Sequence, residues 1–177
     1  MKKLLLWGFA AVLIFAPVPG DAAQGWGLMG EEIVRFDAKV VDLLCELTGD
    51  CPTNCGAGKR QLALLDSSGK LIPVFKNAVS FAGASAELID FCGKTVTADG
   101  LFSTNRDITI FSLQFVREAP DGKWRKGNRF LRRWAETNGV EVNSNFAKAW
   151  FRNDPRVKAL IAAQGKLGLG PGVLPAE

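Results

Sequence analysis

Four cysteines place the strongest constraint on how this 177-residue chain folds. Three of them, Cys45, Cys51 and Cys55, lie within the short stretch CELTGDCPTNC, and the fourth, Cys92, comes much later beside a glycine. An even number of cysteines in an oxidising compartment predicts disulfides, whereas four converging thiolates could instead hold a zinc or copper ion. The closely spaced C-x2-C pairs of many zinc sites are missing. We therefore expect two disulfides and keep a four-thiolate metal site as the alternative.

The first 23 residues have the three-part pattern of a secretory signal peptide. Two lysines precede an apolar run from Leu4 to Ala16, and two prolines and several small residues follow it. The run is shorter than the roughly 20 residues that a membrane-spanning helix needs. We expect cleavage after Ala22 or Ala23 and a periplasmic or secreted protein, with an uncleaved N-terminal anchor as the alternative.

The composition argues against an enzyme. The chain contains no histidine and no tyrosine, which removes the commonest general base and the commonest metal ligand. Its serines therefore lack the histidine that usually activates them, and the glycine-containing stretch CGAGKR lacks the first glycine and the Ser/Thr of a phosphate-binding loop. We expect no catalytic residue and no cofactor.

Residues 24–117 have the pattern of a small β-barrel. Alternating apolar residues in IVRFDAKVVDLLCEL predict a first strand, with Val34, Phe36, Ala38 and Val40 on one face. The stretch RQLALLDSSGKLIPVF predicts a hairpin. A short helix over SAELIDFCG, with Ser85 as its N-cap, precedes two more predicted strands, and a bulge is expected between Ile110 and Phe111.

The order of three strands, one helix and two strands is that of a five-stranded OB-fold barrel. The stretch FCGKTVTADGLFSTNRDITIFSLQFV resembles the last two strands of small exported bacterial OB-fold proteins, and the resemblance covers about residues 33–117. It implies a fold rather than a function.

An OB-fold barrel would bring all four cysteines to one end. Its first strand pairs with its fourth, so Cys45 at the end of one would lie near Cys92 at the start of the other. The loop that carries Cys51 and Cys55 leaves from the same end. We therefore predict the pairs Cys45–Cys92 and Cys51–Cys55.

Residues 118–177 form a basic, tryptophan-containing helical extension with a Gly/Pro-rich tail. Residues 21–116 carry 8 basic and 12 acidic side chains, whereas residues 117–177 carry 12 and 6. The stretch KWRKGNRFLRRWAETNG predicts a helix that ends at Asn138-Gly139. A later helix is expected to begin at Asp154-Pro155 and end at Gly165.

Tryptophan and arginine are favoured anchors of protein interfaces, so this extension is the strongest candidate for a binding surface. The candidate partner-binding residues are Trp124, Arg125, Arg129, Arg132, Arg133 and Trp134. We expect an acidic protein partner in the periplasm. Two alternatives stay open: an anionic ligand such as a membrane head group, a glycan or, less favoured in a secreted protein, nucleic acid, or simple burial of the aromatic rings beneath solvated arginines.

Overall fold

The computed structural model describes residues 22–165 and 168–173. The predicted signal segment therefore lies outside the described residues, except for Ala22 and Ala23. In the described part of the chain, no helix is long and apolar enough to cross a membrane.

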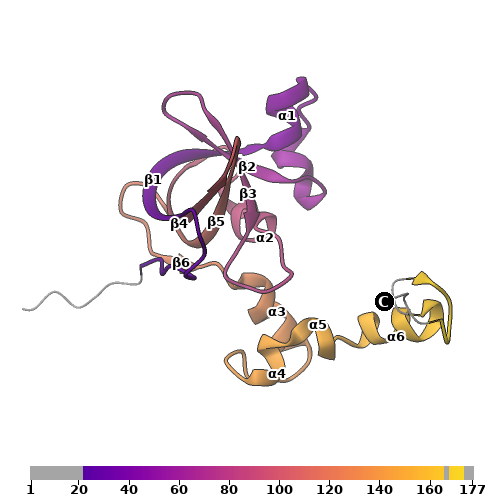
Figure 1. Cartoon of the computed structure of the whole chain (residues 1–177). Helices are drawn as coiled ribbons and strands as arrows, with labels where there is room; N and C mark the ends of the chain where they lie inside the picture. The colour runs from indigo at the N-terminus through magenta and orange to yellow at the C-terminus, as the bar shows by residue number, and fades with distance from the viewer. Residues whose placement is uncertain (1–21, 166–167, 174–177) are drawn as a thin grey trace, which may run out of the picture.

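A barrel of β-strands is followed by short helices that lead away from it (Figure 1). The strands are β1 (Glu31–Asp42), β2 (Leu62–Asp66), β3 (Leu71–Lys76), β4 (Thr95–Asn105), β5 (Ile108–Glu118) and the two-residue β6 (Arg125–Lys126). The helices within the barrel region are α1 (Leu43–Thr48), η1 (Thr53–Gly58), α2 (Ser85–Leu88) and η2 (Ile89–Phe91). The helices of the extension are α3 (Arg129–Thr137), α4 (Asn145–Lys148), α5 (Trp150–Asn153) and α6 (Pro155–Gln164).

The strand order confirms the predicted fold class. The strands lie in the order β3-β2-β1-β4-β5-β6, and a parallel pairing of β3 with β5 closes the first five into a mixed barrel. Helices α2 and η2 lie between β3 and β4 in the chain, as the OB-fold requires. The additional strand β6 pairs with β5 and begins the route to the helical extension.

The barrel interior is filled by the apolar faces of the five strands. Val40, Leu64, Val74 and Phe111 are fully or almost fully buried in one cluster. The predicted inward face of the first strand is confirmed, because its residues 34, 36, 38 and 40 all belong to this cluster or pack against it. A second, smaller cluster, centred on Leu131 and Trp134, joins α3 to α4.

Three local predictions for the barrel were wrong. The first strand ends at Asp42, because the carboxylate of that residue accepts hydrogen bonds from the backbone of Leu44 and Cys45 and starts α1. Ser85 does not cap α2, because its hydroxyl accepts the backbone N–H of Leu62 and joins the helix to β2. The bulge in β5 falls at Gln114, which lies between the partners of Asp99 and Gly100.

The predicted boundaries of the extension helices are confirmed. α3 ends at Thr137, directly before Asn138-Gly139. The carboxylate of Asp154 accepts hydrogen bonds from the first turn of α6, where Pro155 is the first residue, and Gly165 follows the last turn.

Gly100 on β4, which lies opposite the bulge in β5, provides a test of barrel packing. A Cβ atom there would lie 2.2 Å from the backbone oxygen of Ser112 and 2.8 Å from the Phe111 ring. We predict that Gly100→Ala lowers the free energy of unfolding by about 2–3 kcal/mol, since this packing has no room for a methyl group. Urea denaturation followed by tryptophan fluorescence measures the change.

Gly83→Ala is the matched control, because a Cβ atom at Gly83 would meet no other atom within 4 Å. We expect this control to change the free energy of unfolding by less than about 1 kcal/mol. Equal stability of the two variants would contradict the packing described for β4 and β5.

Candidate partner-binding surface and the cysteine cluster

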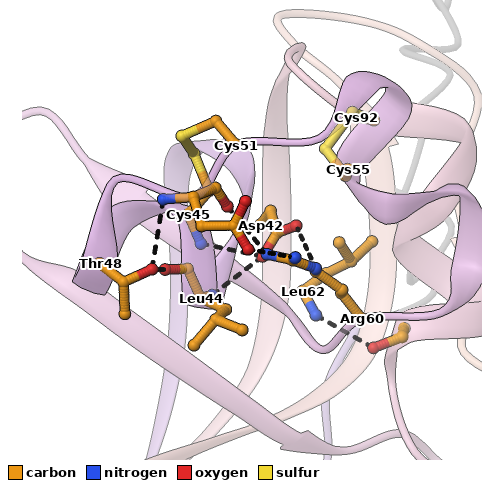
Figure 2. Close-up of polar contacts among 11 residues, drawn as sticks. Asp42, Leu44, Cys45, Thr48, Cys51, Cys55, Arg60, Leu62 and Cys92 are labelled. Carbon is orange, nitrogen blue, oxygen red and sulfur yellow. Dashed lines mark hydrogen bonds and ion pairs between the residues drawn. A yellow bond between two sulfur atoms is a disulfide. The ribbon is translucent and has the colours of Figure 1, made fainter.

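Two disulfides join the four cysteines at one end of the barrel (Figure 2). Cys45 pairs with Cys51 and Cys55 pairs with Cys92. The prediction that two disulfides form near one another is confirmed, but the predicted pairs Cys45–Cys92 and Cys51–Cys55 were wrong.

The helix that Asp42 starts explains the different pairing. Cys45 lies in α1 rather than at the end of a strand, and α1 is followed by Gly49, whose left-handed conformation reverses the chain. This reversal returns Cys51 to within 4.5 Å of Cys45, measured between Cα atoms. The next cysteine, Cys55, is buried and is therefore the one that reaches Cys92 on the barrel.

Arg60 holds the same loop closed from its other side. Its guanidinium donates to the carboxylate and to the backbone oxygen of Asp50, at 2.6 and 2.8 Å, and lies 3.8 Å from the carboxylate of Asp42 (Figure 2). With all four sulfur atoms in disulfides, no free cysteine is left to supply a thiolate. Among residues 22–165 and 168–173, no other group of three or more histidine, cysteine or carboxylate side chains is placed to hold a metal ion.

The predicted partner-binding residues divide into three kinds of environment. Trp124 is half-buried between two arginines, with the guanidinium of Arg35 4.8 Å and that of Arg117 4.7 Å from its ring centroid. Its ring is thus fixed against the barrel, with one part open to solvent.

Arg125 and Arg129 are used to attach the extension to the barrel. Both donate to the same carboxylate oxygen of Asp90 on η2, at 3.2 and 2.5 Å. These contacts lower the pKa of Asp90, with the hydrogen bond from Arg129 as the largest cause. Their charges are therefore partly neutralised inside the molecule.

Arg132 and Arg133 lie exposed on α3 and form no ion pair with any described residue. Lys123 and Lys126, on the neighbouring segment, are also exposed and form none. We call these four residues the open cations. They are the charges of this surface that remain available to a partner.

Trp134 belongs to the second core instead of the surface. It is only 6% exposed, and its indole N–H donates to the carboxylate of Asp154 at 2.6 Å. Because the same carboxylate caps α6, Trp134 joins α3 to α6. This hydrogen bond is the largest cause that lowers the pKa of Asp154.

Two hollows flank α3 and share Arg129. One, of about 610 Å³, lies between the barrel and the extension, and the open cations Lys123, Lys126 and Arg132 line it together with Trp124. The other, of about 570 Å³, lies between α3 and the start of α6 and is lined by Phe130 and Arg133. We call the two hollows, together with the open cations that line them, the basic surface.

Glu87 fixes this surface to the barrel, although sequence reasoning did not single it out. Its buried carboxylate accepts hydrogen bonds from the backbone N–H groups of Arg129 and Phe130, at 3.0 and 3.3 Å, and from the amide of Asn77 at 3.1 Å. It therefore satisfies the first turn of α3 from another element. Burial raises the pKa of Glu87, against the opposing effect of these hydrogen bonds.

The acidic residue Glu87 in the short predicted helix was the only sequence signal for this contact, because Asn128 directly before α3 is itself a favoured N-cap residue. Asn128, which precedes α3, makes no capping hydrogen bond through its side chain. A helix start without its own capping side chain indicates that a partner must come from elsewhere.

Comparison of the chain with models of protein families, with curated proteins and with solved structures finds no match.

The two disulfides should differ in their contribution to stability. They close loops between cysteines 6 and 37 residues apart. On the chain-entropy model, we predict that Cys45→Ala/Cys51→Ala costs about 2 kcal/mol and Cys55→Ala/Cys92→Ala about 4 kcal/mol in free energy of unfolding. Urea denaturation under non-reducing conditions measures both, with the native protein as reference.

Non-reducing peptide mapping of the native protein checks the pairing itself. Recovery of Cys45 linked to Cys92 would contradict the structure, as would equal stability of the two double variants.

Glu87 predicts a pH dependence of stability. Its pKa is raised above the ordinary value of 4.5, so the folded state binds this proton more tightly than the unfolded state does. That stabilisation is complete below the unfolded pKa and is lost as the pH rises through the folded one. We predict that the free energy of unfolding of the native protein, relative to Glu87→Gln, falls as the pH rises from about 4.

Denaturation at a series of pH values measures this difference. Glu136→Gln is the matched control, because Glu136 is exposed on α3, the helix whose first turn Glu87 binds. A difference between native protein and Glu87→Gln that rises with pH over this range would show that the sign is wrong.

Proposed function

We propose that this is an exported, non-enzymatic accessory protein that binds an acidic protein partner through its basic surface. The observation that carries the proposal is the division of the arginines on and beside α3. Arg125 and Arg129 are paired with Asp90, whereas Arg132 and Arg133 are exposed and form no ion pair with any described residue, although the charge of Arg132 is among those that oppose the rise in the pKa of Glu87. Positive charges that the fold leaves unpaired can steer and orient an acidic partner.

The framework beneath these charges supports a preorganised binding site. The start of α3 is held by Glu87, and the rest of the helix by the burial of Leu131 and of Trp134, whose indole also donates to Asp154. A partner therefore would not have to order this helix on binding, which reduces the entropic cost of association.

A protein partner suits the surface better than a small molecule does. Three of the open cations line one hollow with Trp124, and Arg133 lines the other with Phe130, so that charge and aromatic area are spread over both sides of α3. Aromatic rings and arginines are the residues that most often contribute strongly to protein interfaces.

Two disulfides are consistent with an oxidising, extracytoplasmic environment. The signal-peptide pattern of the first 23 residues supports the same location. We therefore place the partner in the periplasm or outside the cell. The absence of histidine from the chain supports a binding role over catalysis.

Charge reversal tests the proposal. We predict that Arg132→Glu/Arg133→Glu weakens binding of the partner at least roughly tenfold, because two attractive contacts become repulsive. The partner is first found by cross-linking in the native compartment and mass spectrometry. Its affinity for each variant is then measured with purified components at several salt concentrations.

Lys39→Glu/Lys59→Glu is the matched control, since it makes the same change of charge at exposed positions on the barrel. We expect it to bind as the native protein does. Equal binding of the partner by the native protein and both double variants would show that the basic surface is not the binding site. Binding of phosphatidylglycerol vesicles, heparin or single-stranded DNA that is lost only in the arginine variant would replace the protein partner by that anionic ligand.

A further inference from the structure

The chain that follows the predicted signal segment is bound along the barrel. The side chain of Gln114 on β5 holds Gln24 on both sides: its oxygen accepts the Gln24 backbone N–H at 3.1 Å, and its amide donates to the Gln24 carbonyl at 2.6 Å. One residue earlier, Ala23 is only 7% exposed, and its backbone nitrogen lies 3.3 Å from a carboxylate oxygen of Asp99. Ala22 is exposed.

Further contacts fix the same segment downstream. The backbone N–H groups of Trp26 and Leu28 both donate to the carboxylate of Glu31, at 2.8 and 3.1 Å. The ammonium of Lys76 lies 4.5 Å from the centroid of the Trp26 ring. The segment that begins at Ala23 is therefore held by contacts with four strands, β1, β3, β4 and β5.

Asp99 is a buried carboxylate with unequal partners. It is 2% exposed and lies on β4, directly opposite Arg35 on β1. Arg35 donates to the Oδ2 atom through both Nε, at 2.9 Å, and Nη2. Among the described residues, the Oδ1 atom accepts only the neutral amide of Ala23. Hydrogen bonds from charged donors stabilise a buried carboxylate more than those from neutral donors. The Oδ1 atom of Asp99, which accepts only a neutral amide in the described part of the chain, therefore has the weaker hydrogen bonding of the two oxygens.

The sequence before Ala23 fits cleavage at this point. Signal peptidases require small residues at the first and third positions before the cleaved bond. For cleavage between Ala22 and Ala23 these positions are Ala22 and Gly20, whereas cleavage one residue later would place Asp21 at the third position. The pattern therefore favours the Ala22–Ala23 bond.

We propose that signal peptidase cleaves the Ala22–Ala23 bond and that the new α-ammonium of Ala23 forms a buried ion pair with Oδ1 of Asp99. Water supplies a hydroxyl to the carbonyl carbon of Ala22 and a proton to the nitrogen of Ala23, and the resulting amine takes up a further proton at neutral pH. The neutral donor at Oδ1 thus becomes a charged one. This inference rests on the proposed export of the protein.

The ion pair makes processing part of folding. The precursor places only an amide against Asp99, whereas the processed chain places a positive charge there and gains a charge-assisted hydrogen bond. The processed protein is therefore more stable than its precursor, and the barrel reaches its full stability only after export.

The first experiment locates the new N-terminus. The full precursor is expressed with its signal segment, and the exported product is examined by intact mass and N-terminal sequencing. We expect the chain to begin at Ala23. A product that begins at Gln24 or elsewhere, or a chain that is never cleaved, overturns the inference, while the Arg132/Arg133 variants test partner binding independently.

The second experiment tests the ion pair. A glycine inserted between Ala22 and Ala23 keeps the residues before the cleavage site and moves the α-ammonium one residue away from Asp99. We expect the equilibrium constant for unfolding to rise roughly tenfold. In an Asp99→Asn background the same insertion should have no effect, whereas in an Asp107→Asn background, where the changed side chain is exposed, the full effect should remain.

A chemical measurement covers the case in which Asp99→Asn fails to fold. The rate of acylation of the α-amino group by an N-hydroxysuccinimide ester should be slower in the native protein than in the glycine-inserted one, because pairing holds the amine protonated and buried. Equal rates, or an unchanged unfolding constant after insertion, would overturn the ion pair.

Discussion

The buried carboxylate of Glu87 determines how the two parts of this protein are joined. A carboxylate in an apolar setting is costly unless its oxygens accept hydrogen bonds, and the first turn of α3 has N–H groups with no partner within the helix. The carboxylate and the helix start satisfy each other, because the oxygens of Glu87 accept hydrogen bonds from the backbone N–H groups of Arg129 and Phe130. The end of the barrel's short helix and the start of the extension are thereby placed together.

Charge is distributed according to this junction. Asp90, one turn after Glu87, neutralises Arg125 and Arg129, which are close to the barrel. Arg132 and Arg133 lie further along α3, form no ion pair with that acid, and remain exposed. The two arginines proposed to bind the partner are therefore those on α3 that Asp90 does not pair, on a helix whose start is held by Glu87.

Sequence patterns predicted the barrel well because its strands alternate in hydrophobicity and its turns carry typical turn residues. They predicted the cysteine pairing wrongly because one capping residue changes the path of the chain. Asp42 had the sequence signal of an N-cap, but the apolar residues around it favoured a continued strand. With α1 in place, Cys45 finds its partner locally and Cys55 spans the longer distance to Cys92.

The sequence alone determined the order of strands, the barrel class, the number of disulfides and the charge contrast between barrel and extension, since these follow from local periodicity and composition. Only the tertiary structure decided which charges stay exposed and which aromatic ring is buried. Trp134 and Trp124 have similar sequence surroundings, yet the first is enclosed by α4 and Asp154 and the second is clasped by two arginines at the surface. Such differences depend on contacts between residues far apart in the chain, which no local pattern contains.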